Sequence, residues 1–439
     1  MTLTAGERPA TEQSPAPRSS RLFPWVVFTL TFGLLLSDYM SRQVLSAVFP
    51  FLKTEWALTD TQLGSLTSIV ALTVGILAVP LSLLGDRFGR ARAVVLMAVV
   101  WSLATVGSAM AANYGQLFIA RFLIGVGEAA YGSVGLAVVL AVFAAHRRAS
   151  LTGAFMAGGS FGSVLGVALG GVFAAHFGWR WAFAAMGIFG LILAVLYWVV
   201  VRESKLEKYR ISDGVGEGPR LGAGRKRAGL ATLFSTPAVV LAYIGGGLQL
   251  FIAGSLFAWL PSYLNRAHGM VPARAAGVAA LLILVMGAGM VICGMITDRV
   301  SRKRPISKWT TAIFFSTLSL VFLGTGFAIA PSKAQLLLLA FGCFFAAGTT
   351  GPTGAMVARL THESIRATAF GTLTFFNNLL GLAAGPIVTG ILADRLGLET
   401  AMKYVPLVAV GAIIALLIGR SVYPSSLKRL EVAEASNNL

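Results

Sequence analysis

The sequence predicts an all-α membrane protein in which twelve transmembrane helices form two pseudo-symmetric six-helix bundles. Three observations predict this fold class. The 439 residues are 56% hydrophobic and 12% charged, with a mean hydropathy of +0.79, whereas soluble domains carry about 25% charged residues. Twelve apolar segments each approach the roughly 20 residues that a helix needs to cross a bilayer. Finally, several motifs recur once in each half.

The apolar segments fall into two groups of six, separated by the longest polar interval. The first group is expected at about residues 24–50, 60–84, 93–112, 117–143, 150–175 and 180–201. The second is expected at about residues 237–264, 273–297, 306–330, 334–358, 367–392 and 400–423. Each segment is long and apolar enough to be a membrane span.

Polar intervals set the predicted domain boundaries. Residues 1–21 lack an apolar core and are rich in Pro and Ser, which predicts a disordered cytoplasmic tail rather than a secretory signal. Residues 202–236 are rich in Gly and basic side chains. They are expected to link a first bundle at 22–201 to a second at 237–423, with a cytoplasmic tail at 424–439.

The basic residues follow the topology. Of the 35 Lys and Arg, 26 lie on the side of the two termini, 7 on the opposite side and 2 within spans. The positive-inside rule therefore places both termini in the cytoplasm, in the inner membrane of a cell. The charges are scattered over loops, so the net charge of +18 indicates attraction to membrane lipids rather than nucleic acid. A monomer is expected.

No cluster of residues predicts an enzyme or an ATP-driven pump. All four histidines fall in loops, and the chain lacks a GxxxxGK[ST] phosphate-binding motif. Cys293 and Cys343 are far apart and have no neighbouring metal ligands. We expect no metal and no organic cofactor.

Two sets of repeated motifs relate the halves. Gly85-Asp86-Arg87-Phe88-Gly89-Arg90 follows the second segment, and Asp298-Arg299 follows the eighth. Glycines 162, 166 and 171 recur as glycines 381, 385 and 390, with a constant offset of 219 residues. Repeated halves around a site at the middle of the membrane are typical of transporters.

These residues resemble the major facilitator superfamily, whose loop after the second span reads approximately GxxxDRxGRR/K. Here Ser82 replaces the leading glycine of the first copy, whereas Gly294 keeps it in the second. The resemblance implies a conformational latch formed by Asp86, Arg87, Arg90, Asp298 and Arg299. The alternative is that the arginines only retain the loops in the cytoplasm.

A glycine stripe runs along the fifth segment. Gly158, Gly162, Gly166 and Gly170 are spaced four residues apart, so they share one helical face and allow close helix packing. The same pattern suits either a sliding or a static interface. The resemblance implies contact with the opposite half.

Four ionisable residues lie deep within the first and fourth segments: Asp38, Arg42, Arg121 and Glu128. By helical rise, the two acids share the middle depth and the arginines lie further from the termini. Arginine gives a permanent charge and a bidentate grip on an anion, which indicates substrate binding by Arg42 and Arg121. A carboxyl group can titrate, so Glu128 and Asp38 are candidates for proton coupling. The alternative is purely structural ion pairing.

Two segments narrow the resemblance. Arg121-Phe-Leu-Ile-Gly-Val-Gly-Glu128-Ala129 is similar to the RxxxGxGEA segment of spinster-like lipid transporters and of organic anion:cation symporters. Residues 251–264 resemble a spinster-like FxxGxxxxWxPxYL run. Both groups usually have an Asp-Arg pair in the first helix, whereas here Ser41 precedes Arg42 and the nearest acid is Asp38.

The second half offers polar and aromatic candidates but no charge in mid-span. Its expected substrate-binding residues are Gln249, Trp259, Tyr263, Asn377 and Asn378. This asymmetry suggests an amphipathic ligand with its head against the first half and its apolar part against the second.

The sequence thus predicts a secondary transporter that works by alternating access and is linked to a proton gradient. The spinster resemblance implies that its substrate is an anionic or zwitterionic, lysolipid-like amphiphile. One alternative is a proton-coupled symporter of a small organic or sugar acid. An alternative of another class is a membrane receptor that does not transport.

Overall fold

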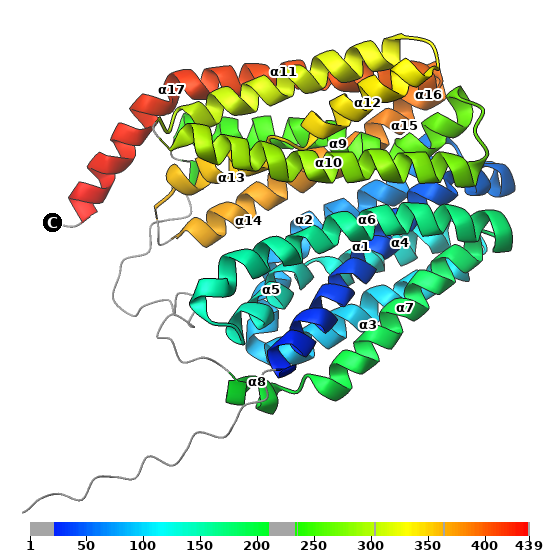
Figure 1. Ribbon diagram of the computed structural model, residues 1–439, viewed down its shortest axis with the longest axis horizontal. Coiled ribbons are helices and arrows are strands. Elements are labelled where there is room, and N and C mark those ends of the chain that lie inside the picture. The colour runs from blue at the N-terminus through cyan, green and yellow to red at the C-terminus, as the bar shows by residue number, and fades with distance from the viewer. Residues whose placement is uncertain (1–21, 210–232, 235, 303, 363–364, 438–439) are drawn as a thin grey trace, which may run out of the picture.

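A computed structural model describes residues 22–209, 233–234, 236–302, 304–362 and 365–437 (Figure 1). Within these ranges every regular element is a helix, and twelve spans are long and apolar enough to cross a membrane. The predicted fold class is confirmed. The proposed tail at 1–21 and most of the proposed linker lie outside the described residues.

The first half contributes six spans and two short helical elements. They are α1 (Leu22–Trp56), α2 (Asp60–Phe88), α3 (Arg90–Ala109), α4 (Tyr114–Glu128) with α5 (Tyr131–Ala141), α6 (Arg148–Phe177) and α7 (Trp179–Val200), with η1 (Ala145–Arg147) before α6 and α8 (Glu203–Tyr209) after α7.

The second half repeats this order. It comprises α9 (Pro237–Ala267), α10 (Pro272–Ser301), α11 (Ser307–Ala328), α12 (Lys333–Ala346) with α13 (Thr350–Arg359), α14 (Arg366–Phe376) with the π-helix η4 (Asn377–Ala383) and α15 (Ala384–Leu396), and finally α16 (Leu398–Tyr404), η5 (Val405–Leu407) and α17 (Val408–Asn437). The stretch expected as a C-terminal tail is helical as far as Asn437, because its Leu, Lys, Arg and Glu residues favour helix.

The fourth and tenth spans are both broken near their middle. The fourth changes from α4 to α5 directly after Glu128, and the tenth changes from α12 to α13 after Ala346. Gly127 and Gly348 stand at these breaks, where glycine lowers the stability of a helix interior. The pseudo-symmetry of the halves thus extends to the break in the fourth and tenth spans, whereas the eleventh and twelfth spans are interrupted and the fifth and sixth are continuous.

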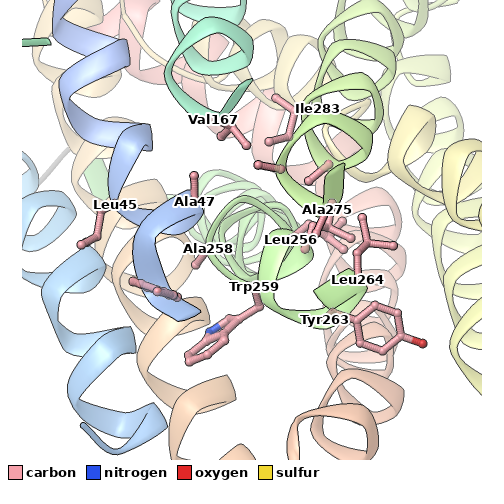
Figure 2. Packing of buried hydrophobic residues seen from close by; sticks show 14 of the residues in the cluster. Leu45, Ala47, Val167, Leu256, Ala258, Trp259, Tyr263, Leu264, Ala275 and Ile283 are labelled. Atoms are coloured by element: carbon pink, nitrogen blue, oxygen red, sulfur yellow. The ribbon is translucent and has the colours of Figure 1, made fainter. Parts of the chain in front are cut away.

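Three hydrophobic clusters show how the halves meet. One is formed only by first-half residues, such as Val27 and Trp101, and another only by second-half residues, such as Tyr243 and Trp309. The third contains buried residues of both halves. In Figure 2 its labelled residues from α1, α6 and α10 lie around α9, which carries Leu256, Trp259 and Leu264.

The shared cluster lies at one end of the molecule. The start of α1 and the end of α17 lie toward the opposite end, at the left of Figure 1. We call the end where α1 begins and α17 ends the termini face, and the opposite end the far face. The halves are therefore joined by apolar packing near the far face and have separate cores near the termini face.

The glycine stripe of α6 faces α1, within its own half. A Cβ atom at Gly162 would lie 2.6 Å from the Leu36 carbonyl oxygen, and one at Gly166 would lie 2.7 Å from that of Met40. The implied contact with the opposite half comes from other positions on α6, where Gly171 meets Ala276 of α10. The glycine stripe thus brings the backbone of α6 close to that of α1. Helix α1 carries most of the cavity charges described below.

We expect Gly166→Ala to destabilise the protein, because the added methyl group would overlap the backbone of α1. Overpacking typically costs about 1–3 kcal/mol. The matched control is Gly153→Ala on the same helix, since a Cβ atom there meets no atom within 4 Å. Thermal unfolding of the purified proteins in detergent should show a lower melting temperature for Gly166→Ala alone. Equal melting temperatures for the two variants would contradict close packing of α6 on α1.

Candidate functional site: a charged cavity closed at the far face

A cavity of about 620 Å³ lies between the two halves. It runs from Asp38 and Arg42, near the middle of α1, to Ser82 near the end of α2 and Thr368 near the start of α14. Those last two positions lie toward the termini face, so the cavity opens there. Its other lining residues are Leu35, Tyr39, Val74, Ala78, Val79, Leu83, Glu128, Ala129, Gly132, Ser133, Met156, Phe370, Gly371, Thr374, Asn378 and Leu382.

Three of the four charges predicted in mid-membrane line this cavity: Asp38, Arg42 and Glu128. Asp38 and Glu128 are 7% and 6% exposed, and their carboxyl groups interact electrostatically with each other and with Arg42. Asp38 Oδ1 and Glu128 Oε1 are buried and have no hydrogen-bond partner among the described residues. The closed end of the cavity therefore combines two carboxyl groups with one guanidinium.

Local sequence explains this convergence. Asp38 and Arg42 are four residues apart on α1, so they share one helical face. Glu128 is the last residue of α4, where the fourth span breaks. The break brings the end of a helix, rather than a continuous helical face, to the cavity wall.

The fourth charge, Arg121, is not among the cavity-lining residues. Its side chain is fully buried and donates three hydrogen bonds to backbone carbonyls: Nε to Leu66 (3.2 Å), Nη1 to Ser41 (3.1 Å) and Nη2 to Arg42 (3.1 Å). It thereby connects α4 to α1 and α2. This geometry favours a positioning role, in which Arg121 fixes the part of α1 that carries Arg42, over the substrate contact expected from the sequence.

The second half supplies a neutral wall. Phe370 and Thr374 on α14 and Asn378 on η4 line the cavity, and the Oδ1 atoms of Asn377 and Asn378 are buried without a described partner. η4 places Asn378 beside Gly75 of α2, where a Cβ atom would lie 2.9 Å from that of Asn378. Of the two asparagines expected to bind substrate, Asn378 lies at the cavity and Asn377 is its neighbour.

The other three candidates of the second half lie away from the cavity lining. Gln249 donates to the carbonyl of Ala346 (3.1 Å), where α12 ends. Trp259 donates to the carbonyl of Pro386 (3.0 Å), and the Tyr263 hydroxyl accepts from Gln335 (2.8 Å). These bonds satisfy buried donors and carbonyls, although Gln249 Oε1 has no described partner. The positions of the three residues favour packing roles.

Residues of the expected latch are only partly described. The side chains of Asp86 and Arg87 lie outside the described set. Arg90 begins α3 and is half-buried, whereas Asp298 and Arg299 are exposed near the end of α10. The latch stays a prediction.

The far face is closed by charges that the sequence interpretation did not single out. The Asp60 carboxylate, 4% exposed, accepts two hydrogen bonds from Arg266 (2.8 and 2.7 Å) and pairs with Lys53 (2.6 Å). Arg266 belongs to α9, and the other two residues belong to the first half. A bidentate, largely buried ion pair therefore joins the halves.

The N-terminus of α2 is capped by another carboxylate, which comes from the second half. Asp394, near the end of α15, accepts hydrogen bonds from the backbone N–H groups of Asp60 (2.7 Å) and Thr61 (2.8 Å) and from the Thr61 hydroxyl (2.6 Å). The first N–H groups of a helix have no partner within the helix, and its N-terminus favours negative charge. Closure of the far face thus completes the N-terminus of α2.

Sequence signals for this closure did exist. Charged residues are scarce on the far side, and Lys53, Asp60, Arg266 and Asp394 all stand at the ends of spans. Their pairing depends on which spans meet across the halves, which no local pattern specifies.

The sequence profile of the Major Facilitator Superfamily matches residues 31–308. The chain belongs to the Major Facilitator Superfamily. Members of this superfamily are transporters, so this major facilitator is an integral membrane protein and not an enzyme.

Its relatives include two kinds of transporter. It is 24% identical to a hexuronate transporter of Bacillus subtilis, covering 85% of this chain and 88% of the relative. It is 25% identical to protein spinster homolog 1 of Homo sapiens, covering 82% and 71%. It also shares its fold with the crystal structure of a bacterial homolog of the human lysosomal transporter spinster, in an inward-facing and occupied conformation. That TM-score is 0.82 with 18% identity, over 93% of this chain and 99% of the other.

We expect Arg121→Lys to lower the stability of the protein and Arg42→Lys to leave it unchanged. A lysine ammonium cannot reach three carbonyls that diverge around a guanidinium, and hydrogen bonds from charged groups contribute about 1.5–3 kcal/mol each. Arg42 lines the cavity, so its replacement keeps the charge without breaking helix contacts. Melting temperatures in detergent provide the measurement. An unchanged melting temperature for Arg121→Lys would contradict the positioning role of Arg121.

Breaking the closure should expose the start of α2. In Arg266→Gln, we expect faster amide hydrogen exchange in peptides that cover residues 60–66, because the Asp60 ion pair and the Asp394 cap act together. Arg395→Gln is the matched control: it is exposed, next to Asp394 and outside the ion pair. Exchange measured by mass spectrometry should rise for the first variant only. Equal exchange in both would show that the pair does not hold the far face closed.

Proposed function

We propose that this major facilitator moves an anionic or zwitterionic, lysolipid-like amphiphile by alternating access, in exchange with or together with protons. The observation that supports this most is the division of the cavity. Its closed end carries Asp38, Arg42 and Glu128, while its walls toward the termini face are largely apolar. A charged head and an apolar chain fit these two regions separately.

The apolar walls argue against a strongly hydrophilic solute. Four large apolar side chains that line the cavity are 42–66% exposed: Val79, Leu83, Met156 and Phe370. A sugar would place some of its hydroxyl groups against these side chains, which can neither donate nor accept hydrogen bonds. An acyl chain gains from the same contact.

Asp38 and Glu128 are proposed to carry the coupling proton. The two carboxyl groups interact electrostatically, which disfavours a second negative charge on the pair, and Arg42 compensates one negative charge. A substrate anion that binds Arg42 would compete with the carboxylates, so its binding would be linked to proton uptake by the acid pair. Neither a metal nor an organic cofactor enters this mechanism.

The positive-inside rule supports a cytoplasmic termini face, so the cavity would open to the cytoplasm in the inner membrane of a cell. The protein is proposed to act as a monomer, since each chain contains both halves of the site. Opening of the far face would then require release of Asp60 from Arg266 and of the α2 N-terminus from Asp394.

A small sugar acid is the second candidate. The similarity to a hexuronate transporter over 85% of this chain favours it, as does the guanidinium of Arg42, which can bind a carboxylate in a bidentate manner. The cavity volume does not discriminate, because water can fill the space around a smaller solute.

Glu128→Gln should abolish solute accumulation driven by a pH gradient while leaving exchange of solute for solute measurable, because the amide cannot release a proton. Proteoliposomes containing the purified protein would be tested with a radiolabelled lysophospholipid and with a hexuronate. Thr374→Ala, a neutral change in the cavity wall, serves as the control and should keep pH-driven uptake.

The outcomes separate the candidates. Saturable lysophospholipid flux supports the proposal, whereas flux of the hexuronate alone would establish the second candidate. Binding without flux under any gradient would identify a receptor. Undiminished pH-driven uptake by Glu128→Gln would exclude this residue as the coupling group.

A further inference from the structure

Two hollows on the outside of the first half meet at a single arginine. One, of about 430 Å³, lies between the start of α3 and the junction of α7 and α8, and Arg92 and Arg202 line it beside Trp198. The other, of about 360 Å³, is a groove between α2, α3 and α4 that is apolar except for Arg92. Neither hollow includes a residue of the transport cavity.

The first hollow is suited to an anion. The side chains of Arg92 and Arg202 are exposed and have no ion pair or hydrogen bond to another described residue. The acid between them, Glu203, is engaged, because its Oε2 accepts a hydrogen bond from the backbone N–H of Ala91 (3.0 Å). Its negative charge therefore compensates the N-terminus of α3 and leaves both guanidinium groups available.

The second hollow is suited to a hydrocarbon chain. Leu84 and Leu96, which form its walls, are 45% and 66% exposed. Along α3 it extends from Arg92 to Val100, a rise of about 12 Å. This is close to the roughly 15 Å thickness of one leaflet of the hydrocarbon core. Trp198, 66% exposed at the rim of the first hollow, has the amphipathic ring that favours the membrane–water interface.

We propose that these two hollows form one binding site for an anionic phospholipid of the leaflet on the termini face. Its phosphate binds between Arg92 and Arg202, and one acyl chain lies in the groove against Leu96. The site is separate from the transport cavity, and its occupant is a membrane lipid rather than the transported solute. It lies against the last turn of α2 and the first turn of α3, so an occupied site would brace the connection between these helices.

The test measures lipid retention by the purified full chain. The protein in detergent is mixed with dioleoyl phosphatidylglycerol or dioleoyl phosphatidylcholine, and bound lipids are counted by native mass spectrometry. We expect phosphatidylglycerol to be retained about tenfold more than phosphatidylcholine, a preference lost in the double variant Arg92→Gln/Arg202→Gln. The double variant Arg304→Gln/Arg420→Gln removes the same charge from exposed positions on the same face and should keep the preference.

The groove has its own pair of variants. Leu96→Trp fills it and should reduce phosphatidylglycerol retention severalfold, whereas Leu103→Trp, on the same helix, exposed and outside the groove, should not. Equal losses in both double variants would mean a general charge effect and would overturn the proposal. So would displacement of the lipid by millimolar inorganic phosphate, which would indicate a phosphate site. Because no solute is transported in this assay, failure here would leave the proposed transport function standing.

Discussion

The Asp60 carboxylate is the point at which the two halves are tied by charge. It is nearly buried, so it needs cationic partners, and it has one from each half in Lys53 and Arg266. The adjoining apolar cluster of both halves and the Asp394 cap on α2 depend on the same approach of the helices. The helices of the two halves are held together at the far face, so they diverge toward the termini face. The cavity is the space between them.

Burying a charge in an apolar medium costs free energy. The four ionisable residues predicted in mid-membrane are accommodated in two ways. Arg121 is satisfied by backbone carbonyls and connects three helices. Asp38, Arg42 and Glu128 remain at the cavity wall, where one carboxyl oxygen of Asp38 and one of Glu128 have no described hydrogen-bond partner. The first arrangement is fixed by geometry, whereas the second is open to a ligand or a proton. Residue type alone does not distinguish them, because both sets contain arginine.

Sequence reasoning predicted what depends on local composition. Span number and approximate position follow from apolar length, and the depth of Asp38, Arg42 and Glu128 follows from helical rise. It failed to predict where a side chain points around a helix that is broken or closely packed. Trp259 and Tyr263 lie in an aromatic motif but pack near the far face, and Arg121 faces backbone rather than cavity. The Asp60–Arg266 pair joins residues 206 apart, so only the packing of spans across the halves reveals it.

The unequal walls of the cavity have an evolutionary consequence. All of its ionisable side chains that could couple protons to transport come from the first repeat, while the second contributes neutral residues on α14 and η4. Substitutions at Phe370, Thr374 or Asn378 alter the shape of the wall without altering its charge. Such a division separates the wall that carries charge from the wall that sets shape, so the second half can vary without changing the charges of the first. A single scaffold can then admit solutes of different shape while its charged wall stays the same.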